Sequence, residues 1–190
     1  MKVRSDYVSN SSSSSFIVIA KDGTDETQAI MDDFRWHDEN WKALEIPCSS
    51  AKHEFGWEWE DTHEFLGKLN FVAIQLLYLY LQKSSGRKSM YAEQYSGADF
   101  TRLYDMLIKV CKEKFGISVR LNVKIIHPSL WKGEDGDYPT GDLVMDTDYY
   151  IDHQSCVTED CCMEMFESEE ALYDFLRFEE SYVRGGNDNG

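Results

Sequence analysis

The sequence predicts an α+β fold, in which a mixed or mainly antiparallel sheet packs on two long helices and one or two shorter ones. Two observations predict it: the two longest helical patterns are consecutive, and two strand patterns follow one another with no helix between them. Strict alternation of strands and helices would instead favour a doubly wound parallel sheet. The chain has 190 residues, 42% of them hydrophobic, which suits a single globular domain over 1–190.

The first half of the chain contains a leader, two strand patterns and a helix pattern. A Ser-rich leader at 1–15 precedes a short β-branched run at 16–20, which is typical of a buried strand. Thr24 is placed to cap a helix that extends to about Arg35. Aromatic residues and glutamates alternate over 54–60, which predicts a half-buried strand with an aromatic inner face.

Two long helices are expected in the middle of the chain. The first spans about 62–83, and its second half is apolar on nearly every face, so we expect it to be the central buried helix. The second starts at Asp99 and stops at Gly116, because glycine readily adopts the left-handed backbone that ends helices. Alternating apolar and polar residues then predict a strand over 117–125.

The last third has shorter patterns. Gly- and Asp-rich composition predicts a loop at 128–141, and short strands are expected at 143–145 and 148–153. Ser168 is placed to cap a short helix. The tail at 181–190 is expected to be flexible unless something ties it down.

The net charge is −16, and nearly all of the excess lies in the last third. Residues 1–132 include 18 acidic and 17 basic residues, whereas 133–190 include 17 acidic residues and two basic ones, Arg177 and Arg184. Such a field repels nucleic-acid backbones and membrane surfaces, so we expect neither as a direct partner. It favours a basic protein surface or bound cations. The simpler interpretation is a solvated acidic surface that keeps the protein in solution.

Cysteine content and apolar runs bear on location. Five cysteines, an odd number in a chain with a full core and no signal-peptide pattern, are typical of reduced thiols in the cytoplasm. The longest apolar run, 71–81, is well short of the ~20 residues that cross a bilayer. We therefore expect a cytoplasmic protein.

The leader carries a distinctive string. Residues 2–16 read KVRSDYVSNSSSSSF, with a basic residue, then Tyr-Val-Ser-Asn, a serine run and an aromatic residue. This string resembles an N-terminal signature of many uncharacterised proteins from bacteriophages and bacteria. The resemblance covers only these residues, and it implies a phage or bacterial origin, a host-cytoplasm location if phage-encoded, and a structural or recognition role for the Asn/Ser segment. A low-complexity surface leader is the alternative interpretation.

One acidic segment in the last third is a candidate catalytic site. On a strand, Asp146, Asp148 and Asp152 would project to one side and His153 to the other. Carboxylates in steps of about 7 Å along one face could hold a hard cation such as Mg²⁺ for metal-dependent hydrolysis. The alternative is the solvated face of an edge strand, where charge discourages pairing with other chains.

A neighbouring group of thiols and one imidazole is a candidate metal site. His153, Cys156, Cys161 and Cys162 fall within ten residues and offer ligands that zinc prefers. Their spacing differs from a zinc knuckle, because adjacent cysteines seldom both face one metal. Free thiols that pack as small hydrophobic residues are the alternative.

No nucleotide-binding loop, nucleophile elbow or dinucleotide fingerprint occurs in the sequence. We therefore expect a non-enzymatic interaction or inhibitor protein that binds a basic partner surface, with no required cofactor. The alternative is a metal-dependent hydrolase built on the Asp/His segment, which would need a divalent metal. The sequence does not indicate an oligomeric state.

Overall fold

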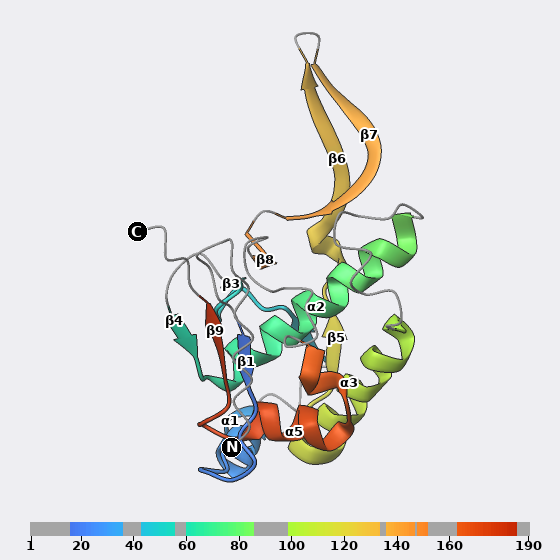
Figure 1. Ribbon diagram of the computed structural model, residues 1–190. Helices are drawn as coiled ribbons and strands as arrows, with labels where there is room; N and C mark the ends of the chain where they lie inside the picture. The colour runs from blue at the N-terminus through green and yellow to red at the C-terminus, as the bar shows by residue number, and fades with distance from the viewer. Residues whose placement is uncertain are drawn as a thin grey trace.

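The computed structural model describes residues 16–35, 43–55, 60–85, 99–133, 136–146, 148–151 and 163–185, and it confirms the α+β class (Figure 1). The leader at 1–15 lies outside the described residues. The described helices are α1 (Thr27–Arg35), α2 (Phe65–Ser85), α3 (Phe100–Phe115) and α5 (Glu169–Arg177), with 3-10 turns at Val123–Ile125 and Glu164–Phe166.

The strands form small sheets. Strands β1 (Phe16–Val18), β9 (Tyr182–Gly185) and β4 (Glu60–Thr62) make an antiparallel sheet in the order β1-β9-β4. The parallel pairs are β2 (Leu44–Ile46) with β5 (Val119–Leu121), and β3 (Glu54–Phe55) with β8 (Tyr150–Ile151). Strands β6 (Ile126–Gly133) and β7 (Gly136–Met145) form an antiparallel hairpin.

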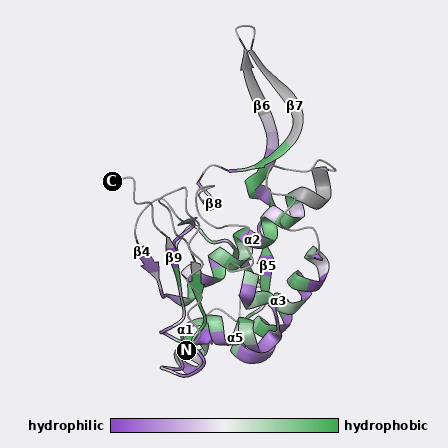
Figure 2. Cartoon of the chain, in the orientation of Figure 1, coloured by the Kyte–Doolittle hydropathy of each residue, from purple (hydrophilic) through white to green (hydrophobic). Residues whose placement is uncertain are grey.

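Helix α2 is the central element, as its pattern predicts. Nearly every residue over 69–79 is buried, and Figure 2 shows hydrophobic residues along this helix and on α3 and α5 around it. Rings of Phe34, Phe65 and Phe115 join α1, α2 and α3 through edge and tilted contacts. No described helix has both the length and the apolar composition that a bilayer crossing requires.

The residues predicted to begin or end helices were confirmed where their capping bonds or backbone preferences are local. Asp99 accepts from the N–H of Thr101 at the start of α3, and Gly116 ends that helix with φ 72°. Ser168 caps α5 by accepting from the N–H of Ala171. The cap assigned to Thr24 was wrong, because α1 begins at Thr27.

One expected strand and one expected loop were also wrong. The run 117–125 does not stay extended: Asn122 accepts from the N–H of Lys124, and this local bond ends β5 and starts a 3-10 turn. The expected loop at 128–141 instead belongs to the β6–β7 hairpin, which projects away from the helices in Figure 1. Its prolines are tolerated because each strand has, in the part of the chain that the structure describes, only one neighbour.

The tail at 181–190 was expected to be flexible unless something ties it down, and strand pairing ties down its first half. Residues 182–185 pair with β1 on one side and β4 on the other, and Ser181 is fully buried. The Ser181 hydroxyl accepts from the N–H of Ala20 and donates to the carbonyl of Asp174. These bonds hold the residues from Ser181 to Gly185 beside β1. Residues 186–190 lie outside the described part.

Candidate functional site

The segment around Asp146 forms a turn rather than a strand. The N–H of Tyr149 donates to the carbonyl of Asp146 at 3.0 Å, and the Asp146 carboxylate accepts from the N–H of Asp148 at 3.4 Å. These bonds curl the backbone, so the arrangement of carboxylates along one strand face is wrong for this pair. Strand β8 begins only at Tyr150.

The remaining candidates, Asp152, His153, Cys156, Cys161 and Cys162, lie outside the described residues. Within the described ranges, no three His, Cys, Asp or Glu side chains are grouped to hold a metal ion. The described thiols are Cys48 and Cys111, and burial raises the pKa of Cys111 to about 12, so that thiol is protonated at neutral pH.

Lys68, a buried lysine with four glutamates near it, is the most distinctive charged group in the described structure. The side chain of Lys68, in the first turn of α2, is fully buried, and its Nζ donates to the carbonyl oxygen of Phe178 at 2.8 Å. Burial lowers its pKa to about 8, and four surrounding glutamates oppose this shift. We call these four residues the glutamate cluster: Glu26, Glu64, Glu179 and Glu180.

Backbone pairing between distant segments builds the glutamate cluster. The N–H of Glu26 donates to the carbonyl of Arg177 at 2.9 Å, and the N–H of Glu179 donates to the carbonyl of Thr24 at 3.1 Å. Thr24 gives both its N–H and its hydroxyl to the Glu180 carboxylate, which explains why it does not cap α1. These bonds hold the segments before α1 and after α5 against each other.

Local hydrogen bonds orient the Glu180 carboxylate and favour its ionised form. Hydrogen bonds from the backbone, together with Lys68, lower the pKa of Glu180. On the neighbouring sheet, the His63 ring donates to the carbonyl of Glu179 at 2.8 Å and packs against Tyr182. Glu64, Glu179 and Glu180 are exposed, whereas Glu26 is half-buried. None of the four forms an ion pair within 4 Å to a lysine or arginine among the described residues.

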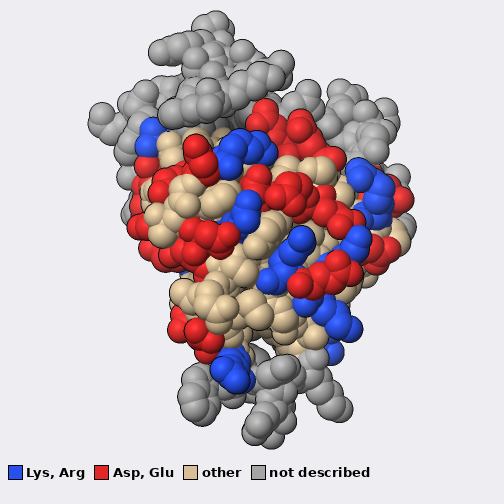
Figure 3. Space-filling view, turned by 90° about the horizontal axis from the view of Figure 1, so that it is seen from below, with Lys and Arg blue, Asp and Glu red and all other residues tan. Residues whose placement is uncertain are grey.

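Other carboxylates of the last third are partly neutralised. Glu169 pairs with Lys109 at 2.8 Å, and Asp174 pairs with Arg177 at 2.8 Å and with Lys21 at 3.5 Å. Figure 3 shows acidic and basic side chains interleaved over the face that carries α1 and α5. The described acidic surface is therefore composed of residues from both ends of the chain rather than from the last third alone.

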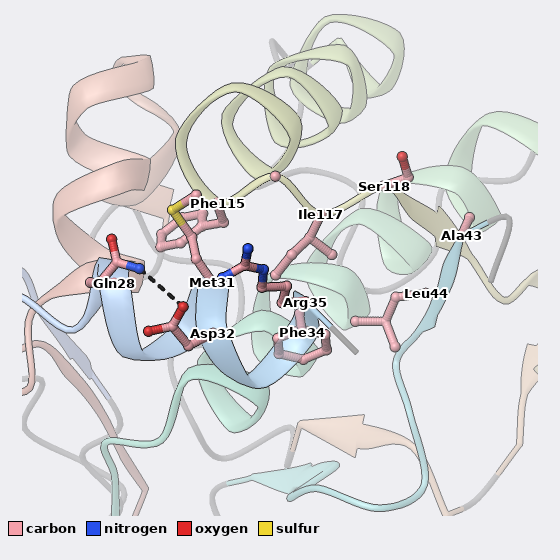
Figure 4. Close-up of a pocket in the computed structure, with 11 residues that line it drawn as sticks. Gln28, Met31, Asp32, Phe34, Arg35, Ala43, Leu44, Phe115, Ile117 and Ser118 are labelled. Atoms are coloured by element: carbon pink, nitrogen blue, oxygen red, sulfur yellow. Dashed lines mark hydrogen bonds between the residues drawn. The ribbon is translucent and has the colours of Figure 1, made fainter. Parts of the chain in front are cut away.

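A pocket of about 250 Å³ lies apart from the cluster, where α1, β2 and the end of α3 meet. Apolar side chains form most of its wall, including Met31, Phe34 and Ile117, and the polar atoms come from Gln28, Asp32 and Arg35 on α1. Figure 4 shows the Arg35 side chain lying between Met31 and Ile117.

No family model matches the chain, and no curated protein or solved structure matches it either.

Sequence reasoning missed both the glutamate cluster and the pocket. One signal did exist for the lysine: Lys68 lies three residues after Phe65 and three before Phe71, on the stripe that the helix buries. The glutamates gave no such signal, because Thr24 and Glu180 are 156 residues apart in the chain.

Proposed function

We propose that the protein is a non-enzymatic binding protein that uses the glutamate cluster to engage a basic surface of another protein. One observation carries the proposal: four glutamates gather around a single buried lysine, which leaves an excess of about three negative charges. The four carboxylates act together on an approaching basic surface, because salt screens exposed charges only beyond the Debye length, which is about 8 Å at physiological salt. The nucleic-acid-binding face of a host protein has the complementary charge, and the leader's resemblance to phage and bacterial proteins is the reason to look for that host among bacteria.

Neutralising the cluster should abolish salt-sensitive capture of basic proteins. We expect the immobilised full chain to retain basic proteins from a bacterial lysate at low salt and to release them at about 0.5 M NaCl. A triple variant, with Glu64→Gln, Glu179→Gln and Glu180→Gln, should retain at least tenfold less of them. Quantitative mass spectrometry of the eluates measures the difference.

A matched control removes three charges elsewhere. Asp33, Glu113 and Glu167 are exposed and lie outside the cluster, so their triple amide variant changes the net charge equally. It should capture basic proteins nearly as well as the unchanged chain. Equal loss in both variants would show that total charge governs capture, and capture that is indifferent to salt would exclude a charge-led mechanism.

The metal-dependent hydrolase is the second proposal, and it rests on Asp146, Asp148, Asp152 and His153. If it is correct, Mg²⁺, Mn²⁺ or Zn²⁺ should raise the melting temperature, because a ligand that binds only the native state stabilises it. Asp148→Asn should reduce that shift, whereas Asp33→Asn should not. A melting temperature that none of the three metals changes would rule the hydrolase out.

A further inference from the structure

The pocket between α1, β2 and α3 has a rigid aromatic and aliphatic floor. Phe34 and Phe115 both contact the ring of Phe65, with centroid distances of 5.9 and 5.1 Å, so the floor is anchored on the central helix. Ile117 is buried beside them, and the N–H of Leu44 donates to the carbonyl of Ser118 at 2.7 Å, which fixes the opposite wall. Such a preformed apolar surface is typical of a small-molecule site.

A cation lies across this apolar surface. The Arg35 side chain extends from the last turn of α1 over the pocket (Figure 4). Asp32, one turn earlier, accepts instead from the Gln28 side-chain amide at 3.1 Å. Within the described residues no carboxylate lies within ion-pair distance of Arg35.

The pocket wall carries one cation, Arg35, and one anion, Asp32, and two lysines lie next to its α3 end. Lys112 and Lys114 occupy the last turn of α3, directly before Phe115, and both are exposed.

We propose that this pocket binds a small carboxylate with an apolar body, such as a single ring on a short chain. The carboxylate would accept two parallel hydrogen bonds from the Arg35 guanidinium, the geometry for which arginine is suited. The apolar body would lie on Met31 and Phe34, which are more exposed than Phe115 and Ile117, in a pocket of about 250 Å³. This site is separate from the glutamate cluster and does not depend on the proposed function.

Titration of the labelled full chain with 3-phenylpropanoate tests the proposal. We expect saturable amide shifts at 31–35 and 115–118 in heteronuclear NMR spectra. The neutral analogue 3-phenylpropanamide should bind at least tenfold more weakly, because it cannot form the charged pair with Arg35. This comparison uses the unchanged protein and therefore does not depend on any variant folding.

Three variants sharpen the result. Arg35→Gln should remove the preference for the carboxylate, whereas Arg102→Gln, an equal charge change in the first turn of α3, should keep it. Ser118→Phe, at an exposed position on the rim, should block both ligands. The proposal is overturned if neither ligand gives saturable shifts at the pocket, if both bind the unchanged protein equally, or if Arg35→Gln leaves the preference intact.

Discussion

Asn70→Ala should destabilise the protein by about 3 kcal/mol, more than any other single amide substitution in the described chain. The Asn70 side chain is fully buried in α2. It accepts from the N–H of Cys48 at 2.8 Å and donates to the carbonyls of Cys48 and Lys52 at 2.8 and 2.9 Å. One amide thus pairs three backbone groups of the segment after β2.

The cost follows from leaving those backbone groups unpaired. A buried donor or acceptor without a partner costs about 1–3 kcal/mol, and relaxation of the segment toward water recovers part of the sum. Urea unfolding measures the change. Asn122→Ala is the control, because Asn122 forms one local bond of 3.3 Å and should cost about 1 kcal/mol. Equal effects of the two substitutions would contradict the account of Asn70.

The second large effect is an unusual rise of stability with pH. Burial lowers the pKa of Lys68 from 10.5 to about 8, so the unfolded chain binds more protons than the folded one between these values. The contribution of Lys68 to stability is therefore reduced below pH 8 and recovers as the pH rises toward 10.5. Between pH 7.5 and 9.5 the lysine alone should add about 2 kcal/mol to the free energy of unfolding.

Comparison with variants isolates this contribution. In Lys68→Met the rise between pH 7.5 and 9.5 should be absent, whereas Lys124→Met, at a highly exposed lysine, should retain it. The glutamate cluster favours the charged lysine, so neutralising Glu64, Glu179 and Glu180 should move the rise to lower pH. Identical pH profiles for the unchanged chain and Lys68→Met would show that Lys68 titrates normally.

Local signals explain what the sequence could predict. The caps at Asp99, Gly116 and Ser168 act through hydrogen bonds or backbone preferences within a few residues, and all three were found. The apolar pattern of α2 was equally decisive, because a helix that is hydrophobic on every face must be buried. Fold class followed from the order of these elements.

Long-range pairing explains what the sequence could not predict. The β6–β7 hairpin contains Pro128 and Pro139 and reads locally as a loop, yet cross-strand partners hold it extended. Strand β9 pairs with β1, more than 160 residues earlier, and that pairing also brings Glu180 to Thr24. The glutamate cluster and the pocket both arise from such contacts, so neither had a sequence motif.

The most direct test of the charge-led binding account is an NMR titration with tetralysine, a minimal basic ligand. If the glutamate cluster is the binding surface, the largest amide shifts will fall at 24–26, 64 and 179–181, and about 0.5 M NaCl will abolish them. Shifts spread evenly over the acidic residues, or concentrated away from these positions, would contradict the account.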